Sequence, residues 1–118
     1  MPLKDRTSYL TSPAEVDNFL QANPTAAIFK VGNCHKTQET FTHVQEHLDP
    51  REDLKLGIIK VIESRSASNH VAAMTGIEHE SPQIILFKDG RNVFDRDNWD
   101  ITDEAVAEGL QQVDAVKA

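Results

Sequence analysis

Hydrophobic positions along the chain recur in two patterns, one typical of amphipathic helices and one typical of strands buried on both faces. Apolar residues spaced by three and four predict helices that begin after Ser12 and at or beside Cys34, and capping residues predict helices near Ser66 and after Thr102. Short apolar runs predict strands at 26–31, 54–62 and 84–88, and a further strand is expected at 92–95. The expected order is therefore α-β-α-β-α-β-β-α, an α/β fold with a mixed four-stranded sheet and helices on both faces.

The ends of these elements carry capping and turn residues. We expect the third helix to be capped by Ser66 or Ser68 and closed by Gly76, a residue suited to a left-handed helix end. Asp89-Gly90 separates the last two strands and predicts a two-residue hairpin with positive φ at both positions. These two strands should be antiparallel, whereas the first two should form a parallel pair joined by a right-handed crossover.

Length and charge narrow the class of protein. With 118 residues, the chain is expected to form one domain, 1–118, around one core. Its net charge of −7 argues against nucleic acid as a partner, because contacts with phosphates need a positive patch. No apolar run approaches the roughly 18 residues that span a membrane, and the N-terminal segment lacks the apolar core of a secretory signal. We therefore expect a cytoplasmic protein without a membrane partner, and a monomer is favoured.

Cys34 is the single cysteine of the chain, so neither an internal disulfide nor an all-cysteine zinc site can form. It is either a small buried apolar residue or a reactive thiol. Its place at the expected start of a helix favours the thiol, because unpaired N–H groups and the positive end of the helix dipole stabilise a thiolate. Lys36 and a protonated His35 would add to this effect. Cys34 is therefore the candidate catalytic residue.

The element order, with one cysteine between the first strand and the second helix, is the layout of the thioredoxin fold. Within it, several stretches closely resemble the monothiol bacilliredoxins, YtxJ-like proteins of bacteria that use bacillithiol; they are residues 61–69, 75–83, 88–90 and 99–102. The resemblance covers nearly the whole chain. Family members carry a Thr-Cys-Pro-Ile-Ser-like segment, and here the segment reads Asn33-Cys34-His35-Lys36-Thr37. The cysteine and a later hydroxyl are kept, but His35 replaces the proline, so we expect a less rigid and more cationic loop.

The resemblance implies a thiol-disulfide oxidoreductase that removes bacillithiol from protein mixed disulfides. Thr37 stands where a dithiol enzyme has its second cysteine, so Cys34 cannot close an internal disulfide. It is expected to take over the small thiol and then to wait for a second thiol to release it. The expected partners are thiolated proteins, with bacillithiol or another low-molecular-weight thiol as co-substrate. No tightly bound cofactor is expected.

Ser81-Pro82 precedes the third expected strand. The sequence alone favours a trans bond, since only about 5–6% of X–Pro bonds in folded proteins are cis. The resemblance instead implies a cis proline facing Cys34, with the Ser81 main chain placed to pair with a substrate backbone. The alternative is an ordinary proline at the start of a strand. His79, three residues earlier, then either acts on the thiolate or lies in solvent.

Other charged residues are candidates for binding. Lys30 and Arg65 could anchor an anionic thiol, because bacillithiol carries carboxylates and a chain of net charge −7 needs local cations to hold it. Exposed, solvated charges are an equal alternative. His43 and His47 have the spacing of a zinc pair, but His43 is expected roughly 13 Å along the helix from Cys34, so we expect a solvated face and no metal site. Trp99 is expected to pack the last helix onto the sheet.

Two further functions remain open from the sequence. In the first, the chain is a thioredoxin-fold binding module whose cysteine is chemically idle. In the second, it is an iron-sulfur carrier that resembles a monothiol glutaredoxin, in which Cys34 from two copies and two external thiols hold a cluster. A reactive thiol would distinguish an oxidoreductase from the binding module. A coloured protein on purification would indicate the iron-sulfur carrier.

Overall fold

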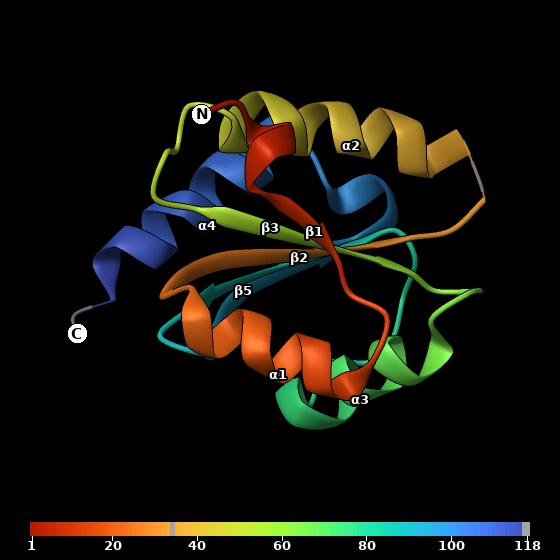
Figure 1. Ribbon diagram of the computed structural model, residues 1–118. Coiled ribbons are helices and arrows are strands. Elements are labelled where there is room, and N and C mark those ends of the chain that lie inside the picture. Colours follow the sequence, from red (N-terminus) through yellow and green to blue (C-terminus); the bar gives the residue numbers. More distant parts are fainter. Residues whose placement is uncertain (34, 117–118) are drawn as a thin grey trace.

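The computed structural model describes residues 1–33 and 35–116. In this part of the chain, five strands form one mixed sheet in the order β1-β3-β2-β4-β5. Helices α2 and α4 cover one face of the sheet, and α1 and α3 cover the other (Figure 1). The elements, in chain order, are η1 (Leu3–Arg6), β1 (Thr7–Tyr9), α1 (Pro13–Ala22), β2 (Thr25–Val31), α2 (His35–Leu48), β3 (Lys55–Lys60), α3 (Arg65–Thr75), β4 (Gln83–Lys88), β5 (Arg91–Asp97), η2 (Asn98–Asp100) and α4 (Asp103–Ala115).

The sheet confirms the expected α/β fold and adds one strand to it. β1 pairs in parallel with β3, in the register Thr7 to Leu56 and Tyr9 to Ile58. This strand was not predicted, because it has three residues, two of them polar, and is too short for an alternating pattern. β3 is parallel to β2, and β4 and β5 are antiparallel, as predicted.

Most predicted ends of elements are confirmed, and one cap is not. Gly76 ends α3 in the left-handed conformation, with φ 73°. Asp89 and Gly90 both have positive φ in the hairpin between β4 and β5. The prediction that Ser66 or Ser68 caps α3 is wrong, because the helix begins one residue earlier and Ser64 is its N-cap residue. The Ser64 side chain makes no capping hydrogen bond, so this start carried no strong sequence signal.

Strand β2 lies at the centre of the sheet and positions the site. It is parallel to β3 on one side and antiparallel to β4 on the other. Its side chains alternate between the two faces, with Ala27 and Phe29 in the core beneath α2 and α4, and Ala26 and Ile28 in the core beneath α1 and α3. The strand ends at Val31, and α2 follows from His35. In the sequence, Cys34 therefore falls between the end of the central strand and the first residue of α2.

Trp99 does not have the role expected of it. Its side chain is 57% exposed, so it does not pack the last helix onto the sheet. Ile101, two residues later, is buried in the core with Val106 of α4 and Val44 of α2. An aliphatic residue directly before the N-cap of α4 therefore performs the packing that was assigned to the larger aromatic ring.

Arg6 fixes the N-terminal segment that leads into β1. Its side chain is buried, and its guanidinium donates hydrogen bonds at 2.8–3.1 Å to the carbonyl oxygens of residues 48, 49, 51 and 54. These carbonyls belong to the end of α2 and to the turn before β3. The planar guanidinium of Arg6 thus holds η1 against the end of α2 and the turn between α2 and β3.

The chain contains no helix that is both long and apolar enough to cross a membrane within the residues that the structure describes.

We predict that Arg6→Lys lowers the free energy of unfolding by about 3 kcal/mol, because one ammonium cannot reach four carbonyls and leaves several of them buried without a donor. Urea unfolding measures the change. Arg51→Lys is the matched control. Its exposed pairs with Asp53 and Asp114 should be worth less than about 1 kcal/mol. Equal effects of the two substitutions would contradict the role given to Arg6.

Candidate active site

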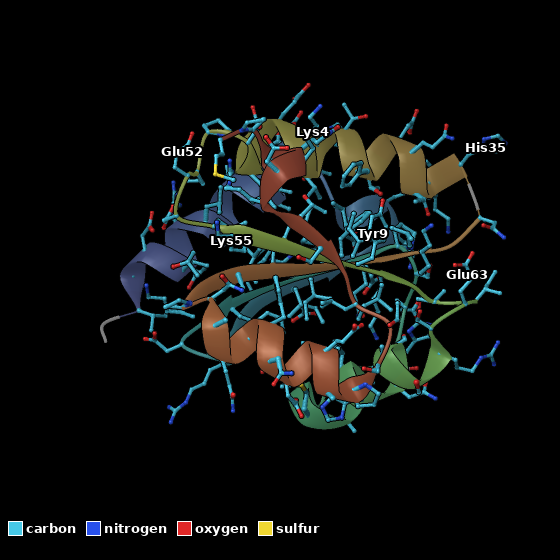
Figure 2. All side chains as sticks on the ribbon, in the orientation of Figure 1. Lys4, Tyr9, His35, Glu52, Lys55 and Glu63 are labelled. Atoms are coloured by element: carbon cyan, nitrogen blue, oxygen red, sulfur yellow. The ribbon has the colours of Figure 1, made fainter. Side chains whose placement is uncertain are left out.

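The residues that bracket Cys34 in the sequence form one end of the molecule, and Cys34 itself lies outside the described residues. The backbone N–H of Gly32 donates to Thr37 Oγ1 at 3.4 Å, which joins the end of β2 to the first turn of α2. Asn33 and His35 are exposed. Figure 2 shows His35 at the outer end of α2 and Glu63 on the loop below it. The first turn of α2 contains no acidic residue, so no carboxylate of that turn opposes the positive end of the helix dipole.

The loop before β4 lies against the end of β2. The Ser81-Pro82 bond is cis, as the family resemblance implied. A Cβ atom added to Gly32 would lie 2.7 Å from Ser81 Oγ, so the absence of a side chain at residue 32 is what lets the loop approach. Ser81 Oγ is buried and has no hydrogen-bond partner among the described residues. The expected contact between the Ser81 main chain and Cys34 falls outside the part of the chain that is described.

Asn98 fastens this loop from the side of α2. Its backbone N–H donates to Pro82 O at 2.9 Å, and its Nδ2 donates to Glu80 Oε1 at 3.1 Å. Its Oδ1 accepts a hydrogen bond of 2.9 Å from Lys36 Nζ. Asn98 has φ 51°, a left-handed conformation that asparagine tolerates better than most residues. Lys36 and the pre-proline loop, both predicted as site neighbours, are thus connected through a residue that sequence reasoning missed.

Lys30 fastens the same loop from the side of α3. The side chain is fully buried, and Nζ donates to Ser68 O at 3.1 Å. It also lies 3.2 Å from His79 Nδ1. Because an ammonium only donates, Nδ1 is the acceptor and the neutral ring carries its proton on Nε2. This burial argues against Lys30 as a direct anchor for an anionic thiol, and it places one edge of His79 against protein rather than in solvent.

Burial and charge both change how this pair titrates. Burial lowers the pKa of Lys30 from 10.5 to about 8. The pKa of His79 is lowered first by partial burial of its ring and then by the nearby Lys30 ammonium. His79 is therefore neutral near pH 7, and Lys30 is the charged member of the pair. Arg65, the other predicted anchor, is exposed at the start of α3.

A hollow of about 430 Å³ opens between α2 and the strands β1 and β3. Asn33 and Thr37, the neighbours of Cys34, line it together with Tyr9 and Lys60. In the strand order, β3 and β4 lie on opposite sides of β2, so the hollow and the pre-proline loop flank the end of the central strand from two sides. The sequence did not predict this feature, because Tyr9 belongs to the strand that was too short to recognise.

The histidine pair on α2 faces a carboxylate. His43 Nδ1 and His47 Nε2 lie 3.0 and 3.2 Å from the same oxygen of Asp103, at the first turn of α4. Within residues 1–33 and 35–116, no group of three or more histidine, cysteine, aspartate or glutamate side chains is arranged to hold a metal ion. The pair therefore links α2 to α4 in this part of the structure.

The sequence model of the monothiol bacilliredoxin BrxC matches residues 8–106. The chain belongs to this family. Membership, together with the fold, supports a thiol redox role for this bacilliredoxin.

Solved structures give the same fold. A candidate oxidoreductase with a thioredoxin fold is 24% identical, with a TM-score of 0.83, and the match covers 92% of this chain and 96% of that one. Mitochondrial thioredoxin 3 from Saccharomyces cerevisiae is 18% identical with a TM-score of 0.72, covering 91% and 95%. Thioredoxin O2 from Arabidopsis thaliana is 14% identical with a TM-score of 0.74, covering 96% and 98%. At such identities the likeness establishes the thioredoxin fold of this bacilliredoxin and nothing further.

We predict that Ser81→Ala raises the free energy of unfolding by about 1 kcal/mol, because it removes a buried hydroxyl that has no described partner. Gly32→Ala should destabilise the wild-type bacilliredoxin, since the new methyl group displaces Ser81 Oγ. In the Ser81→Ala background it should be nearly neutral. Urea unfolding of the four proteins gives the coupling, which we expect to be about 1 kcal/mol or more. Additive effects would contradict the contact.

We predict that the free energy of unfolding of the wild type rises between about pH 8 and pH 10.5, and that Lys30→Met lacks this rise. Across this window the unfolded chain keeps the Lys30 proton and the folded chain loses it, so the free energy of unfolding of the wild type gains about 3 kcal/mol. Below about pH 8 both states carry the proton and the slope vanishes. Urea unfolding at several pH values measures the effect.

The ring of His79 supplies a second measurement for the same variant. Loss of the ammonium should raise the pKa of His79, which NMR titration of the ring protons reports. Lys88→Met, at the other end of the sheet, is the control and should leave this pKa unchanged. A wild-type stability profile with the same slope as Lys30→Met would show that Lys30 titrates normally.

Proposed function

We propose that the protein is a monothiol thiol-disulfide oxidoreductase that removes bacillithiol from protein mixed disulfides through Cys34. The observation that carries this proposal is the position of the single cysteine, directly before a helix whose first turn holds His35 and Lys36 and no acid. The family match supports the same reaction class. We propose that the reaction takes place in the cytoplasm, where protein thiols are kept reduced.

The electrostatics around this position favour an ionised thiol. The N–H groups in the first turn of α2 have no partner within the helix, and the dipole of a 14-residue helix adds positive potential there. The Lys36 ammonium is held in the same turn by Asn98. A thiolate, rather than a thiol, is the species that attacks a disulfide, so these groups raise the reactive fraction of Cys34 near neutral pH.

The reaction consists of two disulfide exchanges. In the first, the Cys34 thiolate attacks the bacillithiol sulfur of a mixed disulfide; a Cys34-bacillithiol disulfide forms, and the protein thiolate leaves. In the second, the thiolate of another bacillithiol attacks the sulfur of the bound one, which gives bacillithiol disulfide and restores the Cys34 thiolate. The sequence permits no internal resolution, because Thr37 stands where a second cysteine would be.

The pre-proline loop is the proposed docking surface for the thiolated protein. It is held on one side by Asn98 and on the other by Lys30, which fixes its main chain before any substrate arrives. A rigid main chain with free hydrogen-bonding groups can pair with an extended segment of a partner at low entropic cost.

We predict that mixing the protein with a bacillithiol-modified protein transfers one bacillithiol to Cys34, seen as an adduct by intact-mass spectrometry. Cys34→Ser should lose the adduct and all reductase activity, because one thiol per chain supports one covalent intermediate. His35→Ala and Lys36→Ala are variants that keep the thiol and should slow the transfer by weakening its ionisation.

Three other outcomes would contradict the proposal. A thiol that alkylates no faster than free cysteine at pH 7 would indicate a binding module with an idle cysteine. Iron and sulfide on a coloured protein would indicate a cluster carrier. A Cys34-to-Cys34 disulfide dimer as the main turnover product would exclude transfer of the small thiol.

A further inference from the structure

We infer that the hollow between α2, β1 and β3 binds the non-sulfur part of the low-molecular-weight thiol, and that this thiol carries a carboxylate, an ammonium group and a hydroxyl-bearing ring. The inference rests on the proposed function, since it concerns the thiol that Cys34 exchanges. It assigns recognition of that thiol to Lys60, Glu63 and Tyr9 rather than to Lys30, which is buried.

The size and position of the hollow fit a small molecule attached to Cys34. Its volume of about 430 Å³ is within the usual range of small-molecule sites. Asn33 lines it from the residue before Cys34, and Thr37 and Gln38 line it from the first turn of α2. Consecutive Cα atoms are about 3.8 Å apart, so a molecule joined to Cys34 by a disulfide is tethered close to these side chains.

One wall of the hollow is apolar and aromatic. Val31, Phe41 and Ile58 form its floor, and they also pack against or within the core under α2. Tyr9 and Ile62 stand at its mouth with 58% and 62% of their surface exposed. Figure 2 labels Tyr9, the last residue of β1, below α2. A sugar-like ring presents C–H groups on its faces, and an exposed aromatic side chain offers them an apolar contact surface.

At the mouth of the hollow, Lys60 supplies one cation and Glu63 one anion, and both are available to a ligand. Lys60 Nζ lies 5.0 Å from the centre of the Tyr9 ring, which holds the ammonium near the opening. Within the described residues neither Lys60 nor Glu63 forms an ion pair. Lys60 can therefore bind a carboxylate and Glu63 an ammonium group of the same ligand. Asn33 and Gln38 supply amide donors and acceptors for hydroxyl groups.

The position of the hollow also determines which sulfur is attacked. A mixed disulfide offers two sulfur atoms, and the route of exchange depends on which one the thiolate reaches. With the small thiol in the hollow and the protein on the pre-proline side, the sulfur of the small thiol lies next to Cys34 and the protein sulfur is the leaving group. The hollow thus favours transfer of the small thiol over formation of a protein-to-protein disulfide.

The test uses full-length Cys34→Ser protein labelled with ¹⁵N, which binds without reacting. S-methyl bacillithiol is the probe, and S-methylglutathione, which has carboxylates and an ammonium group but no sugar ring, is the comparison ligand. We expect S-methyl bacillithiol to shift the amide resonances of Tyr9, Asn33 and Gln38, and to bind more tightly than S-methylglutathione. Resonances of His79 and Ser81, on the other side of β2, should shift little.

Matched variants identify the groups responsible. In the Cys34→Ser background, Lys60→Gln should raise the dissociation constant of S-methyl bacillithiol about tenfold, the effect of losing one charge-assisted hydrogen bond. Lys55→Gln removes the same charge from the other end of β3 and should leave the constant unchanged. Tyr9→Ala should weaken binding of S-methyl bacillithiol more than binding of S-methylglutathione.

The outcomes separate this inference from the proposed function. Transfer of bacillithiol by the wild-type protein, with no probe-induced shifts at the hollow, would overturn the inference and leave the proposed function intact. If Lys60→Gln and Lys55→Gln weaken binding of S-methyl bacillithiol equally, the effect comes from the overall charge of the protein. That result would also overturn the inference. Shifts at the hollow in a protein whose Cys34 never carries bacillithiol would support the hollow as a ligand site and overturn the proposed function.

Discussion

The alternation of side chains along β2 is the constraint on which the rest of the site depends. Because successive residues of a strand point to opposite faces, Lys30 faces α3 while Val31 faces α2. The same strand end therefore has a buried ammonium on one face and an apolar-walled hollow on the other. A shift of one residue in the pairing of β2 would exchange the two, placing a charge in the hollow and a valine against His79. The close pairing of β2 with both β3 and β4 excludes such a shift.

The pre-proline loop takes its position from distant parts of the chain. Lys30 reaches it from the central strand and Asn98 from η2, directly after β5. Gln83, the first residue of β4, donates from Nε2 to Glu78 O in the loop at 3.0 Å. Gly32 sets how near the loop comes to the end of β2. The position of the pre-proline loop is thus set by side chains whose own positions are set by the sheet.

The sequence predicted the elements better than it predicted the site. Helix ends at Ser12, Gly76 and Thr102 have local causes, since each residue caps the helix beside it, and such signals can be read from neighbouring residues. The site instead depends on contacts such as Lys30 with His79 and Lys36 with Asn98, which join residues far apart in the chain. No local pattern encodes these pairs.

Lys30 was expected as an anchor for an anionic thiol or as an exposed charge, and its burial was not predicted. The run 26–31 was expected to form a strand covered on both faces, and in the structure this burial includes the lysine within it. Tyr9 is different. A three-residue strand with two polar residues has no detectable period, so the hollow it helps to form becomes visible only in three dimensions.

The strands at the two edges of the sheet have a consequence for how the molecule behaves among copies of itself. An exposed edge strand can act as a template for a strand from another chain, which leads to aggregation. Here one edge, β1, is only three residues long, and the other, β5, carries Arg91, Asp95, Arg96 and Asp97. A short edge offers few backbone groups for pairing, and an edge with charges of both signs is costly to cover. Both open edges of the sheet are therefore poorly suited to growth by strand addition.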